Sequence, residues 1–103
     1  MTEDDDARSL ISRAAQILRT GGWCQGDYSN YTTGEHCIVG ALLAASTVEG
    51  QDAAYSRAKT LVRLAIGIYP DTGGSIPRWN DEPGRTVDEV LDALERAARW
   101  GMT

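Results

Sequence analysis

The sequence lacks phenylalanine altogether and has a single lysine, a single histidine and only two cysteines in 103 residues. Without Phe, the core must be built from Leu, Ile, Val and Ala, with Trp and Tyr as the bulky side chains. A chain of this length can bury one core without metal or disulfide staples. No apolar run approaches the roughly 20 residues that span a bilayer, so no membrane association is expected. These absences favour a single globular domain over residues 1–103.

Basic residues are also few, 10 against 15 acidic ones, and the formal net charge is −5. Because contacts with phosphates need a basic face, we expect no nucleic-acid partner. The N-terminus has neither the basic nor the apolar stretch of a secretion signal, which predicts a cytoplasmic protein whose Cys24 and Cys37 are thiols. Its acidic run, Glu3 to Asp6, suits the positive end of a helix, and the alternative is an interaction tail.

Apolar spacing predicts two helices in the first half of the chain. The first runs from about Asp5 to Thr20 and ends at Gly21-Gly22, with one glycine in a left-handed conformation. The second begins near Thr32 or Thr33, because Thr32 and Glu35 match a capping box, and it continues through Ala45. This helix is apolar nearly all round, so we expect it in the centre of the domain, with a neighbouring segment close to Gly40.

Two further helices are predicted in the second half. The third covers roughly Gln51 to Ile68, closed by Pro70. Residues 69–85 contain all three prolines and no periodicity, which is typical of a long functional loop, and residues 75–79 are candidates for extended chain. Pro83-Gly84 fits the centre of a type II turn, and Thr86 with Glu89 forms a capping box that begins the fourth helix, Thr86 to Arg99. The expected fold is an all-α, compact four-helix domain with two long aromatic-bearing loops.

Cys24, His36 and Cys37 are the residues that first suggest a metal site. Structural zinc usually takes four ligands in paired halves, whereas two of these three are adjacent and would point about 100° apart on a helix. We therefore expect no metal site. No cofactor is expected either.

Cys37 is a candidate nucleophile, because the start of a helix lowers the pKa of a thiol. Gln25 could stabilise an oxyanion, and Asn80 or Asp81 could orient a base. His36 is the sole histidine but has difficulty reaching the sulfur of its neighbour. The alternative is that Cys37 is a small core residue.

Aromatic side chains gather in the two loops together with polar ones, the composition of binding hot spots. Some of these aromatics could instead plug the open end of a small core, which we favour for Trp23. Arg85 could bind an anionic ligand through two hydrogen bonds or pair with Asp81. The side chains of Asn80 and Asp81 could instead hydrogen-bond the backbone of the turn that follows them. The candidate binding residues are Trp23, Gln25, Tyr28, Trp79, Asn80, Asp81 and Arg85, with Tyr31 and Tyr69 as further aromatics of the loops.

The order of these motifs resembles an uncharacterised family of small actinobacterial and actinophage proteins, the domain of unknown function numbered 6197. The resemblance covers nearly the whole chain and implies a bacterial or phage cytosolic setting, with which the nine arginines agree. It implies no activity, cofactor or substrate. The matching elements are Gly22-Trp23 with Gln25-Gly26, Cys37 with Gly40-Ala41-Leu42, Asn80-Asp81 with Pro83-Gly84-Arg85-Thr86, and Glu89-Val90-Leu91.

The two loops are expected to converge near the N-terminal ends of the second and fourth helices. The function that we expect is a small cytosolic protein-binding module, plausibly phage-encoded, that acts on a host or cellular protein through the aromatic loops. One alternative is a small cysteine-dependent hydrolase or transferase that uses Cys37. Another is a binder of small molecules or nucleotide sugars anchored by Arg85.

Overall fold

The structure is a computed structural model that describes residues 3–30, 32–46, 52–68 and 75–102. Most of it is helical, which confirms the all-α prediction. None of the described helices is both long and apolar enough to cross a membrane. Along the chain the elements are α1 (Glu3–Gly21), β1 (Ser29–Asn30), β2 (Glu35–His36), α2 (Ile38–Ala45), α3 (Asp52–Ile66), α4 (Ile76–Asn80) and α5 (Val87–Ala98).

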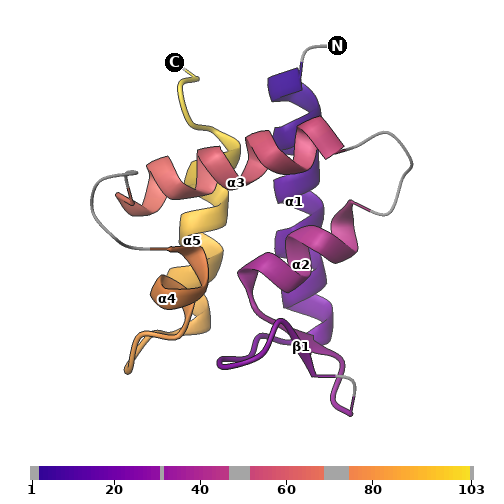
Figure 1. Ribbon diagram of the computed structural model, residues 1–103, viewed down its shortest axis with the longest axis vertical. Helices are drawn as coiled ribbons and strands as arrows, with labels where there is room; N and C mark the ends of the chain where they lie inside the picture. Colours follow the sequence, from indigo (N-terminus) through magenta and orange to yellow (C-terminus); the bar gives the residue numbers. More distant parts are fainter. Residues whose placement is uncertain (1–2, 31, 47–51, 69–74, 103) are drawn as a thin grey trace.

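Helix α1 is central and contacts α2, α3 and α5. In Figure 1, α1 and α5 run antiparallel, and α3 crosses them near the end of the molecule that holds the start of α1 and the end of α5. The short antiparallel pair β1–β2 and helix α4 lie toward the opposite end. We call this opposite end, made of residues 22–37 and 75–86, the loop end.

Aliphatic side chains fill the core, as the absence of Phe requires. Trp23 and Trp79 are only partly buried and pack against its edge. This position agrees with the expectation that Trp23 plugs one end of the core. The largest side chains below 2% exposure are all aliphatic except one amide: Leu10, Ile11, Leu18, Ile38, Leu42, Leu61, Ile76, Leu94, Val62, Val90 and Asn80.

Glycines in the left-handed conformation end the two long helices. Gly22, with φ +95°, follows α1 as predicted, and its N–H donates to Leu18 O over 3.0 Å. The end of α3 differs from the prediction: Gly67 (φ +78°) stops it, and Ile68 N donates back to Arg63 O over 2.9 Å. Pro70, which was expected to close this helix, lies outside the described residues.

The predicted start of the second helix is wrong. Thr32 and Thr33 lie in a turn, where both of their backbone N–H groups donate to Asn30 Oδ1, and Thr33 Oγ1 donates to the carboxylate of Glu35. The helix begins five residues later, with Cys37 as its N-cap. The spacing of Thr32 and Glu35 fits a capping box, but the local turn uses these groups instead.

Gly40 confirms the expectation of a close approach. A Cβ atom on Gly40 would lie 1.8 Å from Tyr28 O, far inside van der Waals contact. Cys37 N also donates to Tyr28 O over 3.0 Å. The loop backbone at Tyr28 therefore rests directly on the first turns of α2, and only glycine at position 40 permits this.

Of residues 75–79 only Ser75 is extended, and the prediction is wrong for residues 76–79, which are helical. Ser75 caps the short helix α4, its hydroxyl accepting from Arg78 N over 3.2 Å, and Pro77 occupies the first turn, where its missing N–H costs nothing. The type II turn that follows is confirmed: Gly84 has φ +86°, and Arg85 N donates to Glu82 O over 3.0 Å.

Candidate functional site

Asn80 joins the two loops at the centre of the loop end. Its side chain is fully buried, and its Oδ1 accepts from Trp23 Nε1 over 2.6 Å and from Ile38 N over 3.1 Å. Its Nδ2 donates to Cys24 O over 3.1 Å and to Asp81 Oδ1 over 3.0 Å. All four hydrogen-bonding positions of the amide are thus used. The prediction that Asn80 serves local turn chemistry is wrong, since three of its partners are distant in sequence.

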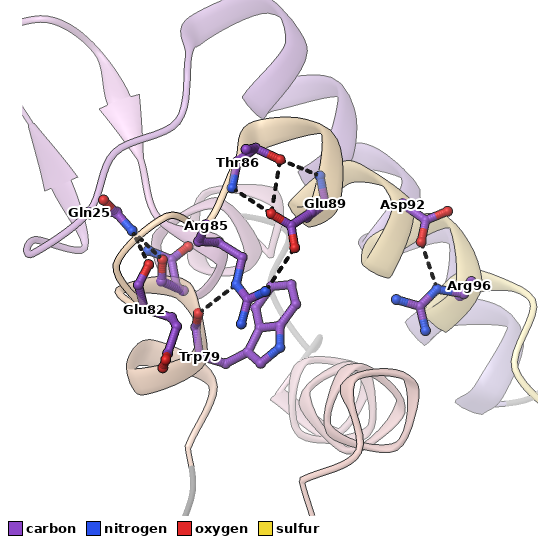
Figure 2. A network of polar contacts seen from close by, with 9 residues as sticks. Gln25, Trp79, Glu82, Arg85, Thr86, Glu89, Asp92 and Arg96 are labelled. Atoms are coloured by element: carbon purple, nitrogen blue, oxygen red, sulfur yellow. Dashed lines mark hydrogen bonds and ion pairs between the residues drawn. The ribbon is translucent and has the colours of Figure 1, made fainter.

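Gln25 and Gly26 add a second layer of contacts between the loops. Gln25 Nε2 donates to Asn80 O and to Glu82 O, each over 3.0 Å, and Figure 2 shows Gln25 directed toward Glu82. Gly26 N donates to Asp81 Oδ1 over 2.9 Å. Both N–H bonds of the Gln25 amide are therefore engaged within the chain, although its side chain borders solvent.

Arg85 lies over the ring of Trp79, with its guanidinium carbon 3.7 Å from the ring centroid. Its Nε donates to Trp79 O and its Nη1 to Glu89 Oε2, each over 3.0 Å, as drawn in Figure 2. Only 16% of the Arg85 side chain is exposed. The expected pairing with Asp81 is wrong: the partner is Glu89, four residues along, which was recognised only as a cap.

Thr86 and Glu89 form the predicted capping box at the start of α5. Glu89 Oε1 accepts from Thr86 N over 3.0 Å, while Thr86 Oγ1 accepts from Glu89 N over 3.2 Å. These hydrogen bonds from Thr86, together with Arg85, hold the pKa of Glu89 below its usual value. One carboxylate therefore caps the helix and fixes Arg85 on Trp79.

Cys37 is a buried cap with 2% of its surface exposed. Its Sγ accepts from Gly40 N over 3.4 Å, but burial outweighs this and raises the pKa of the thiol. The lowered pKa that the helix start predicted is therefore wrong. His36 is engaged elsewhere, because its Nδ1 lies 2.7 Å from Ser29 Oγ.

Cys24 is partly exposed, and burial together with nearby Cys37 raises the pKa of its thiol. Its Sγ lies 3.6 Å from Asp27 O, to which it donates. Across residues 3–30, 32–46, 52–68 and 75–102, no three His, Cys, Asp or Glu side chains are grouped so that they could hold a metal ion.

Tyr28 is exposed, with 56% of its surface accessible, whereas the other aromatic residues predicted for binding, Trp23 and Trp79, are partly buried. Its backbone is fixed against α2 through Cys37 and Gly40, whereas its ring is not covered. Leu43 of α2 is 46% exposed and lines the same shallow depression of about 530 Å³. The residues that line it, called here the Tyr28 surface, are Asp27, Tyr28, Ser29, His36, Gly40, Leu43 and Ala44.

The two loops converge near the starts of α2 and α5, as predicted. The structure places Trp23, Gln25 and Asp81 around Asn80, to which each of them is hydrogen-bonded, while Trp79 and Arg85 form an adjacent pair. Tyr31 and Tyr69 lie outside the described residues. Leu43 was missed because α2 is apolar nearly all round, so the sequence gives no sign of which side stays uncovered.

These features define a small, mainly helical domain whose two loops are locked together through one buried asparagine. The model of a family described as a family of unknown function (DUF6197) matches residues 2–99, and the chain belongs to this family. No curated protein and no solved structure matches the chain.

Proposed function

We propose that this protein is a small protein-binding module that engages its partner through the Tyr28 surface. The observation that carries the proposal is an exposed aromatic ring on a fixed backbone. Tyr28 O accepts from Cys37 N, and Gly40 allows the loop to rest on α2. A side chain that is already positioned loses little conformational entropy when a partner covers it.

Leu43 supports this assignment. Tyr28 and Leu43 are two of the five large apolar side chains that are exposed among the described residues, and both line one depression. A tyrosine beside an aliphatic side chain is typical of the anchor region of protein interfaces. The matching partner presents an apolar side chain to the depression and hydrogen-bonding groups to Asp27 and His36 at its margin.

The proposed setting is the cytoplasm of an actinobacterium, with a phage gene as the source and a host protein as the partner. The nine arginines against one lysine suit a GC-rich genome of this kind. The buried network of Asn80 has a supporting part in this proposal, because it fixes the loop that carries Tyr28.

Affinity capture from an actinobacterial lysate tests the proposal when wild type is compared with Tyr28→Ala and Leu43→Ala. The matched control is Val87→Ala, which trims another exposed apolar side chain, 37% accessible, at the start of α5 and outside the lining of the Tyr28 surface. We expect one protein that the wild type and the control both retain and that the other two variants lose. Equal retention by Tyr28→Ala, or capture of nothing by folded wild type, would refute the assignment.

A further inference from the structure

A second surface lies along the contact between α1 and α5, away from the Tyr28 surface. Three shallow depressions of about 200, 480 and 560 Å³ all include Arg99 in their lining, so they form one groove. We call it the arginine groove. Its charged lining residues are Arg8, Arg13, Arg19, Arg96 and Arg99, with Asp5 and Glu95.

The charge of this groove is opposite to that of the whole protein. Five of the chain's 10 basic residues line it, but only two of its 15 acidic residues do. The formal net charge of the chain is −5. A local excess of arginine on an acidic protein attracts carboxylates to this position in particular.

Arg8 has a donor that the fold leaves without an acceptor. Its Nη2 donates to Trp100 O over 2.7 Å, and its Nη1 lies 4.0 Å from Asp5, too far for a hydrogen bond. Its Nε is buried and has no hydrogen-bond partner among the described residues. Because this N–H is closed to solvent, Arg8 contributes to the groove through its positive charge rather than through a hydrogen bond from Nε to a ligand.

Arg99 differs from the other arginines of the groove. Arg19 pairs with Glu95 over 2.7 Å, whereas no described residue makes a hydrogen bond or ion pair with the Arg99 side chain. Arg99 is the exposed C-cap of α5, at the point where the three depressions meet. A ligand can therefore reach its guanidinium without breaking a contact with any described residue.

The groove also has an apolar margin. Trp100 is 38% exposed and Met102 63%, and both line the part of the groove next to Arg99. An arginine cluster beside an exposed indole and a thioether fits a ligand with both carboxylates and an apolar side chain. Nucleic acid fits less well, because its phosphates would also meet the acidic remainder of the protein.

We propose that the arginine groove binds an acidic, amphipathic segment of a partner protein. A carboxylate of the segment pairs with Arg99, the charges of the neighbouring arginines attract its other carboxylates, and an apolar side chain packs on Trp100 and Met102. This site shares no lining residue with the Tyr28 surface. Its test therefore stands apart from that of the proposed function.

The test is titration of the full chain with a short labelled peptide of alternating glutamate pairs and single leucines, followed by fluorescence anisotropy and by amide chemical shifts. We expect saturable binding that weakens with added salt and shifts centred on Arg8, Arg99 and Trp100. Arg99→Glu should weaken binding at least about tenfold, whereas Arg99→Lys keeps the charge and should stay within about threefold of wild type.

The matched control is Arg78→Glu, the same charge change at an exposed position on α4, which should leave the affinity within about twofold. Circular dichroism confirms that each variant keeps its helices. Equal binding of a peptide with glutamine in place of glutamate would overturn the proposal, as would unchanged binding by Arg99→Glu. Tighter binding of a single-stranded RNA oligonucleotide would also overturn it and indicate a general polyanion site.

Discussion

The loop end and the arginine groove use polar side chains in opposite ways. At the loop end, Asn80 is fully buried, and each of its hydrogen-bonding positions is matched within the chain. In the groove, Arg8 Nε has no acceptor among the described residues and Arg99 faces solvent. The comparison teaches that the polar residues most suggestive of recognition in the sequence build the scaffold. Polar groups without a hydrogen bond to a described residue are found in the arginine groove instead.

The largest difference between the two regions should appear in stability. Asn80→Ala should lower the free energy of unfolding by about 3 kcal/mol, because Trp23 Nε1, Ile38 N and Cys24 O lose their partner in a buried place. Urea denaturation measures this. Gln25→Ala in the same junction is the control and should cost about 1 kcal/mol, since its amide is exposed. Equal effects of the two changes would show that burial does not distinguish Asn80.

Gly40→Ala probes the contact on which the Tyr28 surface depends. The added Cβ would overlap Tyr28 O, so the loop must move, and we expect a loss of about 2 kcal/mol with altered amide shifts around Tyr28. Ala53→Gly, at an exposed position of α3 outside the Tyr28 surface, should cost no more than about 1 kcal/mol through helix propensity alone and leave those shifts unchanged. A stable Gly40→Ala variant with native shifts would contradict the close approach.

A smaller effect should depend on pH. The pKa of Glu89 is lowered in the folded state from its ordinary value of 4.5, chiefly by hydrogen bonds from Thr86. The stabilisation from the ionised Glu89 carboxylate is therefore present above the pKa that Glu89 has in the unfolded chain. It is lost as the pH falls through the lower pKa of Glu89 in the folded protein. The free energies of unfolding of wild type and Glu89→Gln, measured from about pH 7 to about pH 3, should become equal at the acidic end of this range. A constant difference over that range would contradict this role.

The smallest effect on stability should come from the groove. Arg99→Glu should change the free energy of unfolding by no more than about 0.5 kcal/mol, because Arg99 is exposed and holds no other described side chain. Urea denaturation of Arg99→Glu and Asn80→Ala under the same conditions compares their free energies of unfolding directly. A loss comparable to that of Asn80→Ala would make Arg99 part of the scaffold and remove the distinction between the two regions.

Much of the fold could be predicted because its signals are local. The capping box of Thr86 and Glu89, the turn at Gly84 and the end of α1 at Gly22 each depend on a few consecutive residues, and all are confirmed. The start of α2 could not be predicted. Thr32 and Glu35 carry a valid capping pattern, but a turn capped by Asn30 competes for the same backbone groups.

The contact between the two loops was predictable, but the individual hydrogen bonds between them were not. Trp23, Gln25 and Asn80 were grouped correctly, yet their partners lie more than 50 residues apart in sequence. Arg85 was given Asp81 as its partner, whereas the structure pairs it with Glu89. Which of two nearby carboxylates an arginine reaches depends on how the turn directs its side chain, and spacing alone leaves both open.

By itself the sequence determined the helical class, the end of α1, the start of α5, a close approach at Gly40 and membership of the family described above, because periodicity, caps and glycines act through neighbouring residues. Only the tertiary structure decided which polar groups form hydrogen bonds within the chain. Asn80 is buried because α2, α4 and the loop before β1 meet around it, and Tyr28 and Arg99 stay exposed because no described element covers them. Burial is a property of packing between distant segments, and it separates scaffold from surface in this protein.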